Sequence, residues 1–419
     1  MTSRVAVHLQ RRRESQLVGH LLEADRQIFF EYAPTFLATG LELSPFKLPL
    51  RSGVFQQGVP EFLGLPGLFF DSVPDGWGLL LMHRKLRERG NDPERVSPLS
   101  MLRYLGDRPM GALTYHPVDG PDASTAMEVD LESLSREAQA VIEGSADVVL
   151  PELEMAGGSP GGARPKVVVA IGPGHKMVAG SGAAPRGYEH WLVKFSSKAD
   201  NPDSAELEET YARLASKAGI TMPETHLYNV GKKASAFAVK RFDRIGHQRI
   251  HIHTLGGLLH ANHRTPSLDY RSYLQATQAL TRQHPEVLEA FRRMTFNALA
   301  CNRDDHVRNF AFQMSDSGEW SLSPAYDLTF TEGIRGHHTM SFLGETSRPS
   351  RFILRNLASE MSISTKQADS QIDQVESALA NFRKTGRSVG VSEAALKRVE
   401  KRLSEIRKDF QAPATAARV

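Results

Sequence analysis

A polar loop that follows an apolar helix constrains this 419-residue chain more than any other feature. Apolar residues recur at helical spacing between Val287 and Leu299 and lead directly into residues 302–309, which include two adjacent carboxylates. A short hairpin is predicted next, followed by residues 324–328. Because a buried helix holds the loop at its end rigidly, we expect this loop to form a functional site.

The spacing of three side chains in this region suits phosphoryl transfer. Asp304 and Asn309 stand five positions apart, the offset between the base and the metal-binding amide in the kinase pattern H-R-D-x-x-x-x-N. Asp327 follows where a second metal ligand is needed. These groups would deprotonate a hydroxyl and hold Mg²⁺ against phosphates. Acidic residues in a turn are commonly just solvated, so other segments have to support this interpretation.

The composition excludes several classes of protein. The 51 basic residues nearly balance the 48 acidic ones, so the net charge of +3 is not the basic field that holds nucleic acid by itself. The single cysteine, Cys301, excludes an internal disulfide and fits a reducing compartment. Neither a signal peptide nor a spanning helix is predicted at the start, so we expect a cytoplasmic protein with no membrane partner.

Length and patterning predict an α+β protein of two or three domains. Residues 5–9 and 28–32 have the pattern of paired strands. Residues 68–78 are rich in proline and glycine and are expected to form a turn that caps a helix over residues 79–89. A polar, acidic stretch then marks a boundary. The predicted domains are residues 1–120, 121–245 and 246–419, the last of them mainly helical.

Residues 157–166 form a glycine-rich stretch that runs into an apolar strand predicted over residues 167–171. Glycines let backbone N–H groups approach phosphate oxygens closely. The Gly-Lys-Ser/Thr of a Walker A motif is missing, and such a cluster is often a linker. Because the stretch lies between a helical segment and a strand, we interpret it as a lid over the phosphates of a nucleotide.

Lys194 lies on a strand predicted over residues 188–195. Alternation puts Trp191, Val193 and Phe195 on one face and Lys194 on the other. This suits a lysine that reaches ATP phosphates from the floor of a cleft, although a lysine that protects an edge strand gives the same pattern.

The helix predicted after this strand begins with a cap at residues 203–206 and ends at Gly219. Its apolar stripe comprises Leu207, Tyr211, Leu214, Ala215 and Ala218. Glu208 flanks the stripe and is placed to pair with Lys194, as the glutamate of a kinase αC helix pairs; otherwise it is a solvated residue. Residues 237–244 are then interpreted as a strand that leads into a hinge.

Two bundle helices are predicted near the end of the chain. One carries Ile372, Val375, Leu379 and Phe382, and the other carries Leu396, Val399, Leu403, Ile406 and Phe410. The second keeps near-heptad spacing, which allows a seam with a partner helix, but core packing is the favoured interpretation.

The histidines suggest structural roles. His251, His253, His260 and His263 invite a zinc site, but there are no cysteine ligands and no His-Glu-x-x-His motif, which favours hydrogen-bonded structural histidines. His306 is expected to brace the polar loop.

Taken together, these segments resemble the HipA kinases of bacterial type II toxin–antitoxin modules. The resemblance covers nearly the whole chain and rests on residues 69–78, 106–113, 157–166, 240–244, 302–309 and 325–328. It implies a two-lobed protein-kinase-like fold with a small N-terminal α+β subdomain and a helical C-terminal lobe. Arg308 stands where many members have lysine, which keeps the charge.

The resemblance also implies roles for single residues. Asp304 would be the catalytic base, Asn309 and Asp327 the Mg²⁺ ligands, and Lys194 a contact of the ATP phosphates. The ATP site would further include Gly161, Gly162, Lys166, Glu208 and His306. Ser159, seven positions before Lys166, would be autophosphorylated and switch the kinase off. A phosphate there repels those of ATP.

Family members phosphorylate serine or threonine on proteins and are held inactive on DNA by a small helix-turn-helix antitoxin. We therefore expect a HipB-like partner, a protein substrate and contact with DNA only through the antitoxin. Two alternatives remain: a small-molecule phosphotransferase on the same scaffold, and a pseudokinase that regulates DNA binding by its antitoxin.

Overall fold

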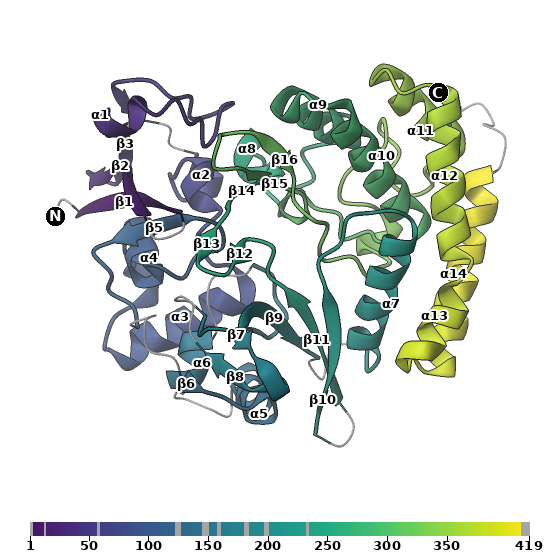
Figure 1. Ribbon diagram of the computed structural model, residues 1–419, viewed down its shortest axis with the longest axis horizontal. Helices are drawn as coiled ribbons and strands as arrows, with labels where there is room; N and C mark the ends of the chain where they lie inside the picture. Colours follow the sequence, from purple (N-terminus) through teal and green to yellow (C-terminus); the bar gives the residue numbers. More distant parts are fainter. Residues whose placement is uncertain are drawn as a thin grey trace.

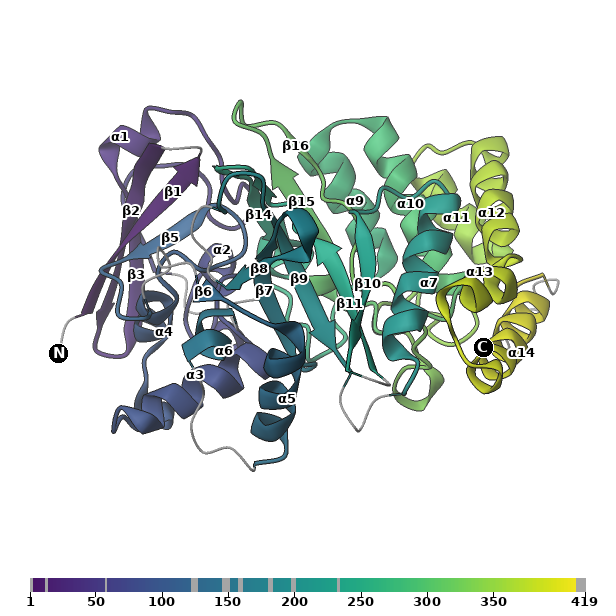
Figure 2. The ribbon, with the colours of Figure 1, turned by 60° about the horizontal axis from the view of Figure 1, so that its bottom comes forward.

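The computed structural model describes residues 3–11, 14–56, 59–121, 127–144, 151–156, 161–179, 184–196, 201–231 and 234–411. The N-terminal sheet lies at one end of the molecule and the last helices of the chain at the other (Figure 1). A second sheet lies between them (Figure 2). We propose three parts, named here the N-terminal subdomain (1–120), the N-lobe (121–245) and the C-lobe (246–419).

An antiparallel five-stranded sheet forms the N-terminal subdomain, in the order β4-β3-β2-β1-β5. Its strands are β1 Ser3–Arg11, β2 Glu14–Ala24, β3 Gln27–Tyr32, β4 Val54–Phe55 and β5 Leu113–His116. Alternation along β1 buries Val5, Val7 and Leu9 completely. Residues 5–9 and 28–32 both lie in strands, as predicted, but each strand pairs with β2 and not with the other.

Short helices complete this subdomain: α1 Pro34–Leu37, η1 Pro60–Phe62, α2 Gly67–Phe70, α3 Gly76–Glu88, η2 Pro93–Arg95 and α4 Pro98–Leu105. The prediction of a turn throughout residues 68–78 is wrong, because α2 occupies its first part and α3 already begins at Gly76. Asp75 stands at the N-cap position of α3 but makes no capping hydrogen bond. Its carboxylate binds partners from other parts of the chain instead.

An antiparallel six-stranded sheet forms the N-lobe, in the order β10-β11-β9-β7-β8-β6. Its strands are β6 Met127–Glu128, β7 Lys166–Ile171, β8 Met177–Ala179, β9 Glu189–Phe195, β10 Thr225–Val230 and β11 Ala234–Lys240. Its helices are α5 Leu131–Ile142, α6 Pro151–Ala156, η3 Pro173–His175 and α7 Ser204–Lys217. Trp191, Val193 and Phe195 of β9 face the core of this lobe, as the alternation predicts.

Helix α7 packs between the N-lobe sheet and the C-lobe helices (Figure 1). Every residue of its predicted apolar stripe is buried. The predicted cap is wrong in its chemistry, because the Asp203 side chain makes no capping bond. Its carboxylate accepts hydrogen bonds from the backbone N–H of Ser392 at 3.0 Å and from the Ser392 hydroxyl at 2.7 Å.

The remaining strands and helices lie in the proposed hinge and the C-lobe. The strands are β12 Arg244–Ile245, β13 Gln248–Arg249, β14 His251–Thr254, β15 Ala311–Met314 and β16 Trp320–Leu322. The helices are α8 Leu255–Leu259, α9 Tyr270–Thr281, α10 His284–Leu299, η4 Val307–Asn309, η5 Ile334–Gly336, α11 Arg351–Glu360, α12 Thr365–Leu379, α13 Phe382–Val389 and α14 Glu393–Gln411. The predicted hairpin is β15–β16. The prediction that Phe382 continues the helix of Ile372 is wrong, since α12 ends at Leu379 and Phe382 begins α13.

Two main hydrophobic cores hold these parts together. One runs from the N-terminal sheet through α7 and the C-lobe helices to Phe410. The other fills the N-lobe and also contains Trp77 and Leu81 of α3. The N-terminal subdomain is therefore packed against both lobes. None of the helices in the described ranges is long and apolar enough to cross a membrane.

Burial of α14 predicts that its apolar face stabilises the C-lobe. Leu396 is completely buried, and its neighbour Lys397 is exposed. Leu396→Ala should lower the free energy of unfolding by about 2–5 kcal/mol, whereas Lys397→Ala should change it by less than about 0.5 kcal/mol. Urea denaturation measures both. Loss of self-association without loss of stability would instead support a seam with a partner helix.

Candidate active site

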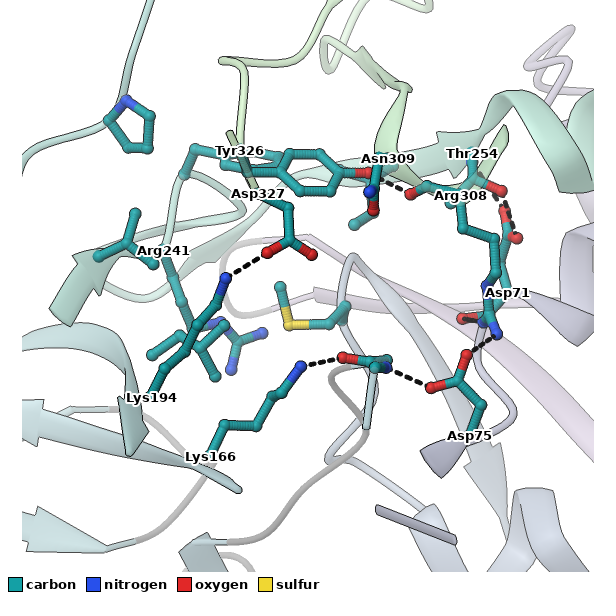
Figure 3. Close-up of a pocket in the computed structure, with 18 of the residues that line it drawn as sticks. Asp71, Asp75, Lys166, Lys194, Arg241, Thr254, Arg308, Asn309, Tyr326 and Asp327 are labelled. Carbon is teal, nitrogen blue, oxygen red and sulfur yellow. Dashed lines mark hydrogen bonds and ion pairs between the residues drawn. The ribbon is translucent and has the colours of Figure 1, made fainter. Parts of the chain in front are cut away.

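A cavity of about 490 Å³ lies where the three parts of the chain meet. The N-terminal subdomain contributes Asp71 and Asp75, the N-lobe contributes Lys166 and Lys194, and the C-lobe contributes Asp327 (Figure 3). The other part of its wall is apolar and includes Leu192, Met222, Phe237, Val239 and Leu328. The cavity therefore combines a charged half with an apolar slot, as ligand sites commonly do.

Lys194 forms the centre of a charged chain in this cavity. Its ammonium donates a hydrogen bond to Glu208 of α7 at 2.5 Å and another to Asp327. Burial alone would lower the pKa of Lys194, but the carboxylates of Asp327 and Glu208 raise it above its usual range. Burial likewise opposes ionisation of Asp327, yet the Lys194 ammonium holds the pKa of that carboxyl far below its usual range. The expected pair with Glu208 is present, and Asp327 extends it to the C-lobe.

Lys166 is a second buried lysine, beside the glycine-rich stretch. Its ammonium donates to the carbonyl of Gly161, and burial together with the charge of Lys194 lowers its pKa to about 8. Gly162 has a φ of +99°, a backbone conformation that favours glycine. Residues 157–160, which include Ser159, lie outside the described residues.

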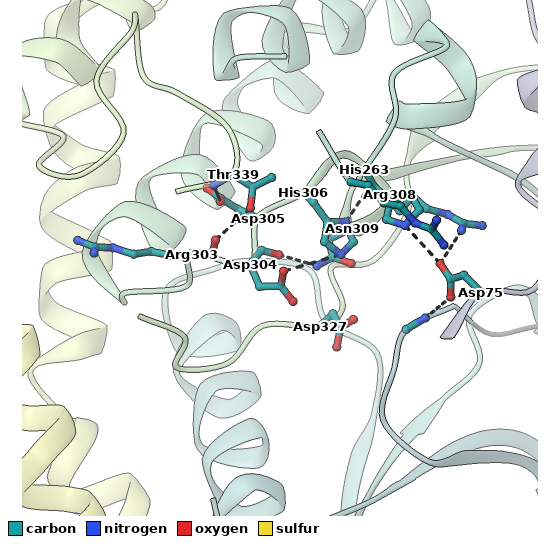
Figure 4. A network of polar contacts seen from close by, with 12 residues as sticks. Asp75, His263, Arg303, Asp304, Asp305, His306, Arg308, Asn309, Asp327 and Thr339 are labelled. Carbon is teal, nitrogen blue, oxygen red and sulfur yellow. Dashed lines mark hydrogen bonds and ion pairs between the residues drawn. The ribbon is translucent and has the colours of Figure 1, made fainter. Parts of the chain in front are cut away.

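The adjacent carboxylates in the polar loop have opposite surroundings (Figure 4). The Asp305 side chain is fully buried and is hydrogen-bonded to the Tyr270 hydroxyl at 2.7 Å, to His338 Nδ1 at 2.8 Å and to the Thr339 N–H at 2.7 Å. The Asp304 side chain is 61% exposed and lines the cavity. Asp305 therefore holds the loop in place, and Asp304 is the carboxylate that a ligand can reach.

The pKa of Asp304 lies above its usual value. Desolvation by the surrounding protein is the largest cause, His306 opposes it, and the negative charge of Asp327 adds to it. A carboxyl whose pKa is raised holds a proton more strongly than an isolated aspartate. This property suits a group that has to accept a proton.

Asn309 and Asp327 bring oxygen atoms to the same part of the cavity as Asp304 (Figure 4). The Asn309 Nδ2 donates to the backbone carbonyl of Asp304 at 2.7 Å, which leaves the amide oxygen as its acceptor. A carboxylate and an amide oxygen fit Mg²⁺, which is typically held by one or two carboxylates together with phosphates and water. This donor set is therefore suitable for a Mg²⁺–nucleotide complex.

His306 braces the loop. Its Nδ1 accepts a hydrogen bond from the backbone N–H of Arg308 at 3.3 Å, and its Nε2 lies 4.0 Å from Asp304 Oδ1. These contacts agree with the expected brace. His306 also lines the cavity.

Three of the four histidines considered for a zinc site make structural hydrogen bonds, whereas His263 lines the cavity with its Nε2 3.8 Å from Asp75 Oδ2. His251 Nε2 lies 3.1 Å from the Leu43 carbonyl, and His253 contacts Asp71 at 2.6 Å through Nδ1. His260 Nε2 accepts from the backbone N–H of Gly67 at 3.0 Å. These contacts join β14 and α8 to the N-terminal subdomain.

The sequence alone did not reveal Asp71, Asp75 and Arg308 as parts of the site. Asp71 accepts hydrogen bonds from the backbone N–H and the hydroxyl of Thr254 at 2.7 and 2.6 Å. Asp75 pairs with Arg308 at 2.6 Å. The local indications were two carboxylates within the proline- and glycine-rich segment 68–78 and the position of Arg308 in the polar loop, but the contacts between them join residues far apart in sequence.

The two adjacent aspartates should differ in their effect on stability. Asp305→Asn should lower the free energy of unfolding by about 1–3 kcal/mol, since an amide cannot accept all three hydrogen bonds. Asp304→Asn is the matched control and should change it by less than about 0.5 kcal/mol, because Asp304 is exposed. Urea denaturation compares them. Equal losses would contradict the structural role of Asp305.

Two family models match the chain. The HipA-like C-terminal domain matches residues 158–382, more than half of the chain, and the HipA N-terminal domain matches residues 9–116. The chain is 27% identical over 293 residues to "Putative kinase Y4dM" of Sinorhizobium fredii and 29% identical over 154 residues to "Putative kinase" of Haemophilus influenzae. These matches cover 65% and 33% of this chain, and 64% and 44% of the relatives, less than two thirds of either relative.

A solved structure has the same fold. It is HipA of the Shewanella oneidensis toxin–antitoxin system, in a complex with HipB and operator DNA, and matches with a TM-score of 0.69 at 16% identity. The match covers 97% of this chain and 96% of that chain. Since both family models and the fold agree, the chain belongs to the HipA family.

Proposed function

We propose that this protein is an ATP-dependent kinase that phosphorylates serine or threonine on a protein. The observation that carries this proposal is the placement of Lys194 between Glu208 and Asp327 in a cavity that Asp304 also lines. In protein kinases, a lysine–glutamate pair and a metal-binding aspartate have to be in place together. Family membership supports the same conclusion.

The two halves of the cavity suggest how ATP would bind. The adenine ring would occupy the apolar slot, and the phosphates would lie near Lys166, Lys194 and the backbone of Gly161 and Gly162. Asp327 and Asn309 would hold Mg²⁺, which when bound neutralises charge on the phosphates. Glu208 would act through Lys194 by fixing its position.

Asp304 would serve as the base. Its exposed carboxylate would orient the acceptor hydroxyl and take its proton as the phosphoryl group leaves ADP. Asp305 cannot take this role, because its oxygens are already hydrogen-bonded within the protein.

A HipB-like helix-turn-helix antitoxin is the partner that we propose. HipA of Shewanella oneidensis is seen with HipB and operator DNA, and its fold matches this chain over nearly its whole length. Contact with DNA would then be indirect, which agrees with a net charge of only +3.

Replacing the proposed base and metal ligand should abolish phosphate transfer. Asp304→Asn should slow transfer from labelled ATP into protein by about 10²–10⁴-fold, the usual contribution of a general base. Asp327→Asn should do the same, and phosphoproteomics after induction should then show no new phosphoserine or phosphothreonine. Glu319→Gln, an exposed site in the β15–β16 turn, is the control. Label found only in small molecules would contradict protein kinase activity.

We further propose that autophosphorylation of Ser159 inactivates the kinase. The resemblance places this serine in the glycine-rich stretch, where a phosphate of about −1.5 to −2 charge would compete with those of ATP. Ser159→Ala should therefore incorporate no phosphate and keep its ATP affinity after incubation with Mg²⁺–ATP, whereas the unmodified sequence should lose it. Intact-mass measurement and ATP titration test this. The idea fails if the alanine variant behaves as the unmodified sequence does.

A further inference from the structure

The start of α3, from its N-cap Asp75 to Trp77, makes hydrogen bonds to the described part of the glycine-rich stretch, residues 161–166. The backbone N–H of Gly162 donates to the Asp75 carboxylate, and the carbonyl of Gly162 accepts from the backbone N–H of Trp77 at 3.0 Å. The indole N–H of Trp77 donates to the Lys166 carbonyl at 2.8 Å. Residues 162 and 166 are thus both hydrogen-bonded to the start of a helix of the N-terminal subdomain.

The same carboxylate also binds the polar loop. Asp75 Oδ2 accepts from Arg308 Nη1 at 2.6 Å, and Arg308 immediately precedes Asn309 (Figures 3 and 4). Both side chains are largely buried, 15% exposed for Asp75 and 12% for Arg308. One carboxylate therefore joins the glycine-rich stretch to the loop that carries the proposed base and metal ligand.

The close approach of these segments depends on glycine. Gly76 has a φ of +42°, and a Cβ there would lie 2.5 Å from the Gly162 carbonyl oxygen. A Cβ at Gly161 would lie 3.1 Å from Asp75 Oδ1. A side chain at residue 76 would collide with the backbone of Gly162, and one at residue 161 would press on the Asp75 carboxylate, so the two segments are in tight contact.

We infer that Asp75 is a positioning residue that sets the place of residues 161–166 of the glycine-rich stretch relative to the polar loop, which makes the N-terminal subdomain part of the phosphate site. This inference rests on the proposed function. A glycine-rich segment loses much conformational entropy when it orders around phosphates. A segment that is already held by Asp75 has less entropy to lose, so ATP binds more tightly.

Comparing ATP with adenosine tests the inference, because only ATP has phosphates. In Asp75→Asn the amide can present its oxygen to Gly162 or to Arg308 but not to both. The Kd for Mg²⁺–ATP should rise about tenfold, as expected for loss of a charge-assisted hydrogen bond, while the Kd for adenosine changes less than twofold. The control is Asp25→Asn, in the exposed β2–β3 turn of the same subdomain, which should change neither. Unchanged ATP affinity, or equal weakening of both ligands, would overturn the inference.

A double-mutant cycle identifies the partner of Asp75. If Asp75 acts through Arg308, then Asp75→Asn should weaken ATP binding little further in an Arg308→Gln background. Additive losses would contradict the link. If Asp75→Asn fails to fold, Arg308→Gln alone tests the link, because it removes the C-lobe partner of Asp75 and should also weaken ATP binding.

Hydrogen exchange gives a readout that needs no activity. The backbone amide of Gly162 should exchange faster in Asp75→Asn than in the unmodified protein, and equal protection would count against the inference. If the unmodified protein transfers no phosphate while ATP affinity and exchange change as expected, the proposed function fails and the positioning role stands.

Discussion

The site depends on one buried ammonium group. Lys194 would be costly to bury alone, and its two carboxylate partners come from different parts of the chain, Glu208 from α7 and Asp327 from the C-lobe. Removing one partner of such a buried group leaves an uncompensated charge, so the three side chains depend strongly on one another. The position of α7 relative to the C-lobe is consequently tied to the geometry of the charged half of the cavity.

In the polar loop, one of two adjacent carboxylates anchors the loop and the other faces the cavity. Asp305 points into the C-lobe, where Tyr270, His338 and Thr339 hold it. Asp304 points into the cavity. A loop that is anchored by one carboxylate can present the other with little freedom, which is the condition for a well-placed functional group.

Sequence patterns predicted the elements whose partners lie nearby or whose periodicity is regular. Alternation along β9 identified the two faces of that strand, and the stripe of α7 identified its buried side, because a period set by backbone geometry is visible in any single chain. The cap predicted at Asp203 was wrong for the opposite reason, because the distant Ser392 binds its carboxylate instead. Asp75 stands at the N-cap position of α3, and the distant Arg308 binds its carboxylate in the same way. The preference of aspartate for helix caps is thus overridden by tertiary contacts. Such contacts cannot be predicted from the periodicity of a sequence.

Besides the contacts of Asp71 with Thr254 and His253, two groups of hydrogen bonds attach the N-terminal subdomain to the site. Near the hinge, the buried Asp243 accepts from the backbone N–H of Gly111 at 2.7 Å, and Arg244 donates to the carbonyls of Gly111 and Pro109 at 2.8 and 3.0 Å. At the glycine-rich stretch, Asp75 and Trp77 make the second attachment. A rotation of one lobe about residues 241–244 would have to carry the subdomain along or break one of these attachments. Opening of the cavity would therefore move all three parts, and these hydrogen bonds would limit how far the two lobes separate.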